Sequence, residues 1–166
     1  MVRLAQINTN RSRPSQDLIA RVCEEFELGL VAVSEPNRVP CDDRWVASTD
    51  TPPSAAVIWQ WSRSRVPCSS RWRGTRFAAV DWGDMIVVSC YFPPSLSDGE
   101  FLRDLRELEA KMREVIGRPI IVLGNFNARA PAWDPEQSNR RGRLLLDWLG
   151  LLNLQLLNVV LEPTYA

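Results

Sequence analysis

Two short runs made only of apolar residues constrain the fold of this chain most strongly. Residues 30–33 and 119–123 are too short to form buried helices and are typical of strands buried on both faces. Each run follows a segment in which apolar residues recur at helical spacing, from Leu18 to Phe26 and from Phe101 to Ile116. Buried strands that follow amphipathic helices indicate helices packed on a sheet.

Shorter segments predict the remaining elements. Ser97 and Glu100 form a capping box that predicts the start of the second helix, whereas Ser15 and Gly29 are expected to bound the first. The sequence Asp-Trp-Gly-Asp at residues 81–84 predicts a hairpin turn. Further strands are expected at residues 4–8, 44–47, 55–61, 77–80, 85–91 and 155–158, and a third helix at residues 143–149.

The order of these elements favours a mixed sheet over a purely parallel one, because some strands form hairpins while others alternate with helices. The sequence therefore predicts an α/β fold, in the form of a two-sheet α/β sandwich flanked by helices. A length of 166 residues suits one domain, and no linker, repeat or low-complexity segment divides the chain. We expect a single domain that spans residues 1–166.

Composition excludes several classes of protein. No apolar run approaches the roughly 20 residues that cross a bilayer, and the N-terminus is too polar for a signal peptide, so we expect a soluble intracellular protein. The chain has four cysteines, none in a Cys-x-x-Cys pair, and no histidine, which argues against a structural zinc site and for four reduced thiols. The absence of histidine also removes the usual general base at neutral pH.

Polar side chains follow the ends of the predicted apolar strands. They are Asn8, Glu35, Tyr91, Asn125 and Asn127. Open α/β sheets place their sites at strand ends, so we expect these five side chains to converge. Each of them, taken alone, also has an ordinary interpretation as a solvated loop acid, a turn-capping amide or a half-buried strand aromatic.

The most specific motif is Ile-Val-Leu-Gly-Asn-Phe-Asn-Ala at residues 121–128. It resembles the Gly-Asp-Phe-Asn-Ala motif of the endonuclease/exonuclease/phosphatase family, with Asn125 where that family has aspartate. Three other segments resemble that family in the same order. Residues 6–8 match its first metal-site strand, residues 33–37 the strand that ends in a metal-binding glutamate, and residues 89–94 the strand with a phosphate-contacting tyrosine.

Finer details resemble one branch of that family, the endonuclease domains of non-LTR retrotransposons. They are Tyr-Phe-Pro-Pro-Ser at residues 91–95, and Asn-Ala-Arg-Ala-Pro-Ala-Trp at residues 127–133 followed by Asn-Arg-Arg-Gly-Arg-Leu-Leu at residues 139–145. The resemblance covers about residues 4–164. It implies a deoxyribonuclease-I-like fold, DNA as the partner and a location in the nucleus.

The same resemblance implies Mg²⁺-dependent hydrolysis of phosphodiesters. Glu35 would hold Mg²⁺, which prefers oxygen ligands, and Asn8 would add a neutral oxygen ligand or a phosphate contact. Tyr91 would donate a hydrogen bond to the pentacovalent phosphate, and Asn127 would orient the scissile phosphate or the water. The metal would polarise the phosphate and stabilise the leaving oxygen.

Three departures from the family pattern predict weak or absent cleavage. Asn125 replaces the acid, and an amide cannot accept the nucleophile's proton, a loss that costs about two to four orders of magnitude in rate. The family's C-terminal Ser-Asp-His signature has no counterpart, and the sequence ends where the family continues into further strands. We therefore expect a sandwich that lacks its last strands, with marginal stability and a sheet edge covered by a partner or by self-association.

Nineteen of the twenty cationic residues are arginines, which bind phosphates bidentately, although a GC-rich coding bias explains this content equally well. One arginine cluster contains interleaved tryptophans 59, 61 and 72, and a second lies near residue 140. Both clusters are candidates for nucleic-acid contacts, although a solvated strand face above core tryptophans explains the first cluster equally well. The candidate residues are Arg63, Arg65, Arg71, Arg73, Arg140 and Arg141.

Two other functions stay open at this point. One is a catalytically dead module that binds nucleic acid or protein, and the other is a family phosphatase or deadenylase. The Pro-Pro sequence after Tyr91 and the Ala-Arg-Ala-Pro-Ala-Trp sequence favour the retrotransposon branch over the phosphatases.

Overall fold

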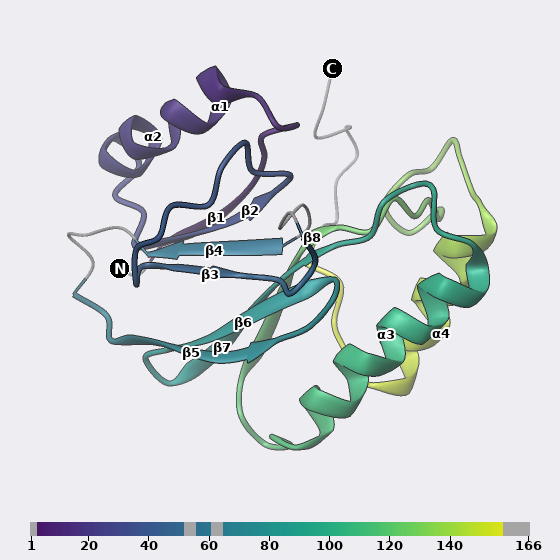
Figure 1. Cartoon of the computed structure of the whole chain (residues 1–166). Helices are drawn as coiled ribbons and strands as arrows, with labels where there is room; N and C mark the ends of the chain where they lie inside the picture. Colours follow the sequence, from purple (N-terminus) through teal and green to yellow (C-terminus); the bar gives the residue numbers. More distant parts are fainter. Residues whose placement is uncertain (1–2, 52–55, 61–64, 158–166) are drawn as a thin grey trace.

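The computed structural model describes the backbone of residues 3–51, 56–60 and 65–157, and the side chains of these residues except 56–60. Two four-stranded sheets pack face to face, with helices on their outer sides (Figure 1). The first sheet has the order β1-β2-β4-β3 and the second β5-β6-β7-β8. The strands are β1 (Leu4–Asn8), β2 (Leu30–Ser34), β3 (Trp45–Ala47), β4 (Ala56–Gln60), β5 (Cys68–Arg73), β6 (Phe77–Trp82), β7 (Met85–Tyr91) and β8 (Ile120–Asn125).

The first sheet is built around β2, whose five residues are all buried, as predicted. Strand β1 pairs with β2 in parallel, and β4 pairs with it in the antiparallel direction. Two short helices, α1 (Arg13–Asp17) and α2 (Ile19–Glu25), cover the outer face, where Ile19 and Cys23 pack against β2. The prediction of one helix starting at Ser15 is wrong, because the side chain of Ser12 caps α1 three residues earlier.

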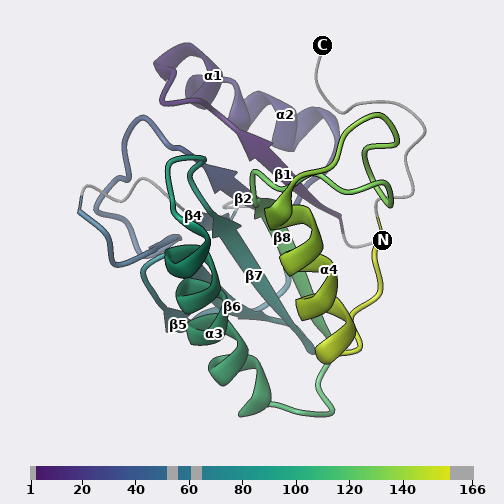
Figure 2. The ribbon, with the colours of Figure 1, turned by 90° about the vertical axis from the view of Figure 1, so that its right-hand side faces the viewer.

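The second sheet combines a hairpin with a parallel crossover. The predicted turn joins β6 to β7, and α3 (Asp98–Arg113) leads from β7 to the parallel strand β8. Helix α3 begins at the predicted capping box of Ser97 and Glu100. Helix α4 (Arg140–Leu151) lies beside α3 on the same face of the sheet (Figure 2). It starts at residue 140 rather than 143, because the side chain of Asn139 caps it.

A third apolar cluster joins the sheets, with Leu30 of β2 packed against Val80, Trp82 and Val87 of the second sheet. The layers therefore follow the order helices, sheet, sheet, helices, which confirms the predicted two-sheet α/β sandwich. All four cysteines are free, as expected. Strand β5 was not predicted, because its sequence Cys-Ser-Ser-Arg-Trp-Arg carries few of the apolar residues that signal a strand.

Strand β8 differs from its prediction as a strand buried on both faces. All six of its residues are only half-buried, because within the described residues β8 is the edge strand of its sheet. Residues 155–157 form no strand, and residue 158, the last of that predicted strand, lies outside the described residues. Marginal stability, and self-association over this edge, stay predictions.

Candidate active site

Alternate residues of β2 and β7 face the space between the two sheets, and this face becomes polar toward the carboxyl ends of the strands. On this inner face β2 begins with the apolar Leu30 and ends with the polar Ser34, and β7 changes in the same way from Val87 to Tyr91. The parallel partners β1 and β8 end at the same level with Asn8 and Asn125. Four strands thus deliver their last polar side chains to one end of the sandwich.

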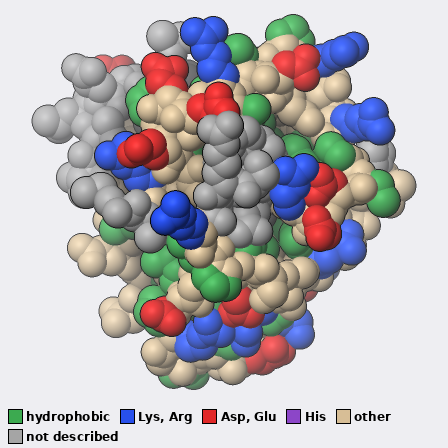
Figure 3. Space-filling model, turned by 90° about the vertical axis from the view of Figure 1, so that its left-hand side faces the viewer, with side chains coloured by type: hydrophobic (Ala, Val, Ile, Leu, Met, Phe, Trp, Pro, Cys, Tyr) green, Lys and Arg blue, Asp and Glu red, His purple; other side chains and the backbone are tan. Residues whose placement is uncertain are grey.

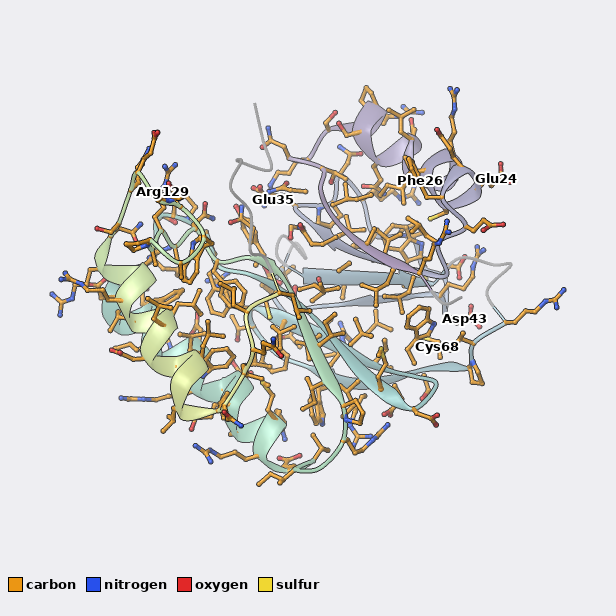
Figure 4. The ribbon with its side chains drawn as sticks, turned by 180° about the vertical axis from the view of Figure 1, so that it is seen from behind. Glu24, Phe26, Glu35, Asp43, Cys68 and Arg129 are labelled. Atoms are coloured by element: carbon orange, nitrogen blue, oxygen red, sulfur yellow. The ribbon has the colours of Figure 1, made fainter. Side chains whose placement is uncertain are left out.

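Glu35 lies at the centre of this end, directly after β2. Its carboxylate accepts a hydrogen bond from Nδ2 of Asn8 at 3.1 Å and another from the hydroxyl of Tyr91. Its φ of +50° lies in the left-handed region, which costs a non-glycine residue about 1–2 kcal/mol. Figure 4 shows Glu35 where the ends of the two sheets meet. Strain of this kind is typical of functional sites, where the surrounding structure enforces it.

The backbone of Glu35 is held in this conformation by the loop after β1. Its carbonyl oxygen accepts hydrogen bonds from Oγ1 of Thr9 at 2.7 Å and from the backbone N–H of Arg11 at 2.7 Å. Thr9 is only 1% exposed, so its hydroxyl is available for little else. The loop therefore fixes the direction in which the Glu35 carboxylate points.

Tyr91 provides a hydrogen-bond donor that stays protonated. Burial raises the pKa of its hydroxyl to about 12, and the hydrogen bond to Glu35 and the negative charge of Glu35 act in the same direction. The positive charges of Arg11 and Arg76 lower this pKa and only partly oppose the rise. The phenol therefore remains a donor at neutral pH.

The turn after β8 places the two asparagines of the main motif. Gly124 has a φ of +146°, and a Cβ atom there would lie 1.9 Å from the carbonyl oxygen of Cys90, so the strand can end here only with glycine. Asn125 then pairs in register with Tyr91. Its Oδ1 accepts a hydrogen bond from the backbone N–H of Asn127 at 2.9 Å.

Asn127 is fixed from a second side. Its φ is +48°, and its Nδ2 donates to the carbonyl oxygen of Phe92 at 2.9 Å. The ring of Phe126 stacks on Phe92 at a centroid distance of 5.1 Å. The structure therefore brings all five predicted site residues to one end of the sandwich and fixes the orientation of both asparagines.

The oxygen ligands at this site are few. Glu35 is its only carboxylate among the predicted residues, and the described residues contain no group of three or more His, Cys, Asp or Glu side chains that could hold a metal. Asn8 uses its Oδ1 to accept the N–H of Asn10 at 2.8 Å. Mg²⁺ commonly binds through one or two carboxylates plus substrate phosphates, so this set fits a Mg²⁺ ion that shares its coordination with a phosphate.

The first arginine cluster lies largely away from this site. Arg65 is exposed and lies just before β5. The start of β5 pairs with the end of β6, which pairs with the start of β7. Tyr91 is at the other end of β7, about 20 Å from that start. Arg71 is bound to Asp81 at 2.9 Å. Arg73 lies at the site end of the sheet, and its Nε donates to the carbonyl oxygen of Ala47 at 2.6 Å. Arg63 and the side chains of tryptophans 59 and 61 lie outside the described residues.

The end of the sandwich away from the site carries no basic patch in the visible part of its surface. There, acidic and basic side chains are interspersed (Figure 3). A surface of mixed sign attracts a polyanion only weakly. A nucleic-acid surface is therefore better sought at the other end, beside Glu35.

The second arginine cluster supports the fold. Arg140 pairs with Asp98 at 3.0 Å. Arg141 is only 7% exposed, and its guanidinium donates to the carbonyl oxygens of Pro93 at 2.9 Å, Pro94 at 3.1 Å and Leu96. A guanidinium used in this way fixes the loop after β7 and has little donor capacity left for a nucleic acid.

Three residues near the site were not predicted as site residues, although Arg76 belongs to the first arginine cluster of the sequence. Thr9 and Arg11 hold the backbone of Glu35, and Arg76 lies close enough to Tyr91 to influence its pKa. Arg76 is itself held by Asp104, a buried acid of α3, at 3.2 Å. The sequence gives no sign of their place beside Glu35 and Tyr91, because each acts through a neighbour that only the fold provides.

Comparison with known proteins shows which folds and which family model this chain resembles. Residues 85–166, which include Tyr91, Asn125 and Asn127, match the family model described as endonuclease–reverse transcriptase. The fold is similar to that of the endonuclease domain of TRAS1, a telomere-specific non-LTR retrotransposon, with a TM-score of 0.85 and 22% sequence identity over 99% of this chain and 77% of that one. The chain therefore has the fold of these endonucleases, and its second half matches the endonuclease–reverse transcriptase family model.

A second solved structure has a similar fold. An AP endonuclease from Archaeoglobus fulgidus has a TM-score of 0.58 and 12% identity over 92% of this chain and 71% of that one. No curated protein matches the chain. Within the described residues, no helix has the length and apolar character needed to cross a membrane. Asn8 and Glu35 precede the segment matched by the family model, so their place in the site rests on the geometry described above.

Proposed function

We propose that this chain is an endonuclease domain of the non-LTR retrotransposon type, which hydrolyses DNA phosphodiesters with Mg²⁺ in the nucleus and is slowed by Asn125. The observation that carries this proposal is the direct contact of Glu35 with Asn8 and Tyr91, with Asn125 opposite Tyr91 in the neighbouring strand. The similarity to the TRAS1 domain supports the choice of substrate.

Each side chain has a distinct part in the proposed reaction. Tyr91, kept protonated by its raised pKa, would exchange its bond to Glu35 for one to a phosphate oxygen on which charge develops. Asn127, anchored through Nδ2 to Phe92, leaves its Oδ1 to orient the water or phosphate. Mg²⁺ held by Glu35 would polarise the phosphate and stabilise the leaving oxygen.

Asn125 is the weak point of this site. Its Oδ1 accepts the N–H of Asn127 just as a carboxylate oxygen could, so the local turn tolerates the amide. The amide nevertheless has no basic oxygen to take the proton of the attacking water. Loss of a general base lowers the rate by about two to four orders of magnitude, while the turn around it stays intact.

The second candidate is a binding module without catalytic activity. It is favoured by the single carboxylate at the site and the positively charged Arg11 and Arg76 nearby. Such a site would attract a phosphate before any Mg²⁺ adds to its positive charge.

Nicking of supercoiled plasmid in Mg²⁺ tests the proposal. The parent protein should nick slowly or not at all, and Asn125→Asp should nick about 100-fold faster or more, because it restores a base. The matched control is Asn153→Asp, which makes the same change at an exposed residue after α4 and should leave the rate unaltered. Failure of Asn125→Asp to nick would overturn the enzymatic proposal and leave the binding module.

A further inference from the structure

The arginines of the second sheet and its helices are mostly occupied. Among the described residues, Arg71 and Arg118 share Asp81, Arg140 binds Asp98, and Arg141 binds three carbonyl oxygens. A guanidinium that already has such a partner must break an ion pair or a hydrogen bond before it can bind a ligand. Free guanidiniums are therefore the better candidates for contact with a nucleic acid.

Two exposed arginines beside Glu35 are free in this sense. Arg11 and Arg38 are both exposed, and in the described part of the chain neither guanidinium has an acidic or carbonyl partner. Arg38 follows Glu35 by three residues, and Arg11 donates its backbone N–H to the carbonyl oxygen of Glu35 at 2.7 Å. Both therefore start from backbone that adjoins the central carboxylate.

The backbone of Arg11 is rigid although its side chain is free. Its carbonyl oxygen accepts Nδ2 of Asn37 at 2.9 Å, so both of its backbone polar groups are bonded. Its φ is +56°, directly after Asn10 with a φ of +47°. Two successive left-handed residues cost about 1–2 kcal/mol each. Strain that persists at a site rim indicates that the direction of this side chain matters.

The backbone of Arg38 is fixed in a similar way by one residue of α1. Its N–H donates to Oε1 of Gln16 at 3.1 Å, and its carbonyl oxygen accepts Nε2 of Gln16 at 2.6 Å. A cation on a rigid backbone loses less conformational freedom when it binds an anion. Arg11 and Arg38 thus meet the physical requirements of a prepared phosphate contact.

Charge balance at the site points to the same ligand. Glu35 is one negative charge, and Arg11 and Arg38 are two positive charges on the adjoining backbone. The backbone N–H of Arg11 bonds the carbonyl oxygen of Glu35 at 2.7 Å, so the charge of Arg11 is carried at the edge of the site. The site therefore attracts an anion before any divalent metal adds to the positive charge.

We propose that Arg11 and Arg38 form a phosphate-binding rim that holds the DNA backbone beside Glu35, and that this rim works without a divalent metal. The inference rests on the proposed function for the identity of the ligand, a nucleic-acid phosphate. It goes beyond that function because binding through the rim requires neither cleavage nor Asn125.

The test is the affinity for a fluorescent 20-base-pair DNA duplex, measured by anisotropy in EDTA at several salt concentrations. Each phosphate contact contributes about 0.9 to the slope of log affinity against log salt. The double variant Arg11→Gln/Arg38→Gln should lower this slope by about 2 and the affinity at 0.1 M salt by roughly 60-fold. Arg106→Gln, an exposed α3 arginine without a partner in the described residues, is the matched control and should change neither quantity.

Three results would overturn the rim. They are a parent protein that does not bind the duplex in EDTA, a double variant with the parent's slope, and an equal loss in Arg106→Gln. The outcome is separable from that of the proposed function. Nicking by Asn125→Asp together with unaltered binding in the double variant removes the rim alone, whereas rim-dependent binding without nicking removes the endonuclease alone.

Discussion

Arg141 provides a test of whether the second arginine cluster supports the fold or contacts DNA. Its side chain is buried between α4 and the loop after β7, and it donates to the carbonyl oxygens of Pro93, Pro94 and Leu96. Its guanidinium also lies 5.2 Å above the ring of Phe101. Arg141→Met keeps the apolar stem of the side chain and removes all four interactions.

The expected loss of stability follows from these contacts. Hydrogen bonds to a charged group contribute about 1.5–3 kcal/mol each, which sets an upper limit of roughly 5–9 kcal/mol for three. Burial of the charge offsets part of this sum, while three carbonyl oxygens lose their donor, so the net loss is expected to be about 3–5 kcal/mol. For a chain of this size, that loss lowers Tm by roughly 6–20 °C.

The assay is thermal and urea unfolding followed by circular dichroism. Arg140→Met is the control, because its pair with Asp98 is exposed and contributes about 0–1 kcal/mol. The structural role requires that Arg141→Met unfold at a clearly lower urea concentration than Arg140→Met. A stability equal to that of the parent, combined with a large loss of DNA affinity, would refute the reasoning and restore Arg141 as a nucleic-acid contact.

Three further predictions concern the glycines of α4, the titration of Tyr91 and the support of Glu35. Gly142→Ala should destabilise the protein by about 1–3 kcal/mol, because a Cβ atom would lie 1.8 Å from the carbonyl oxygen of Arg129. Gly150→Ala, in open space on the same helix, should stabilise it by about 0.5–1 kcal/mol, and equal melting temperatures for the two would contradict the packing. Ionisation of Tyr91 is measured as the ultraviolet absorbance change that the parent shows and Tyr91→Phe lacks. This change should occur near pH 12 in the parent and at a lower pH in Glu35→Gln, where the negative charge is removed. The folded state holds the Tyr91 proton more tightly than the unfolded state does. The resulting stability is fully present below pH 10 and is lost as the pH rises from 10 toward 12. Thr9→Val should lower the affinity for Mg²⁺ in the presence of DNA without a large loss of fold, and unaltered Mg²⁺ affinity would show that the hydroxyl does not position Glu35.

The place of the site could be predicted from the sequence because strand ends are local features. The apolar run before Glu35 and the glycine before Asn125 both mark where a buried strand stops. Parallel pairing then brings these ends together, so polar residues after strands gather in one region. The same reasoning anticipated Tyr91 and Asn8.

The arginine partners could not be predicted in this way. A guanidinium lies several bonds from its backbone, so its partner depends on which acid or carbonyl oxygen the fold brings near. Arg71 meets Asp81 across a hairpin, and Arg141 meets a loop more than 40 residues away. Arg11 is prominent only once the fold shows its backbone bound to Glu35.

The half-burial of β8 was also beyond the sequence. An apolar strand is buried only if other elements cover both of its faces and a strand pairs with each of its edges. Within the described residues β8 pairs with a strand on one edge alone. Strand β5 shows the converse, because pairing with β6 makes a strand of a segment with weak β-propensity.

The most direct measurement of the central claim is the nicking rate of Asn125→Asp compared with Asn125→Asp/Glu35→Gln over a range of Mg²⁺ concentrations. We predict that the single variant nicks plasmid with a rate that rises with Mg²⁺, and that the double variant returns to the parent's rate. Equal nicking by both variants would show that Glu35 takes no part in the reaction, and it would contradict the assignment of this strand-end cluster as a phosphodiester-cleaving site.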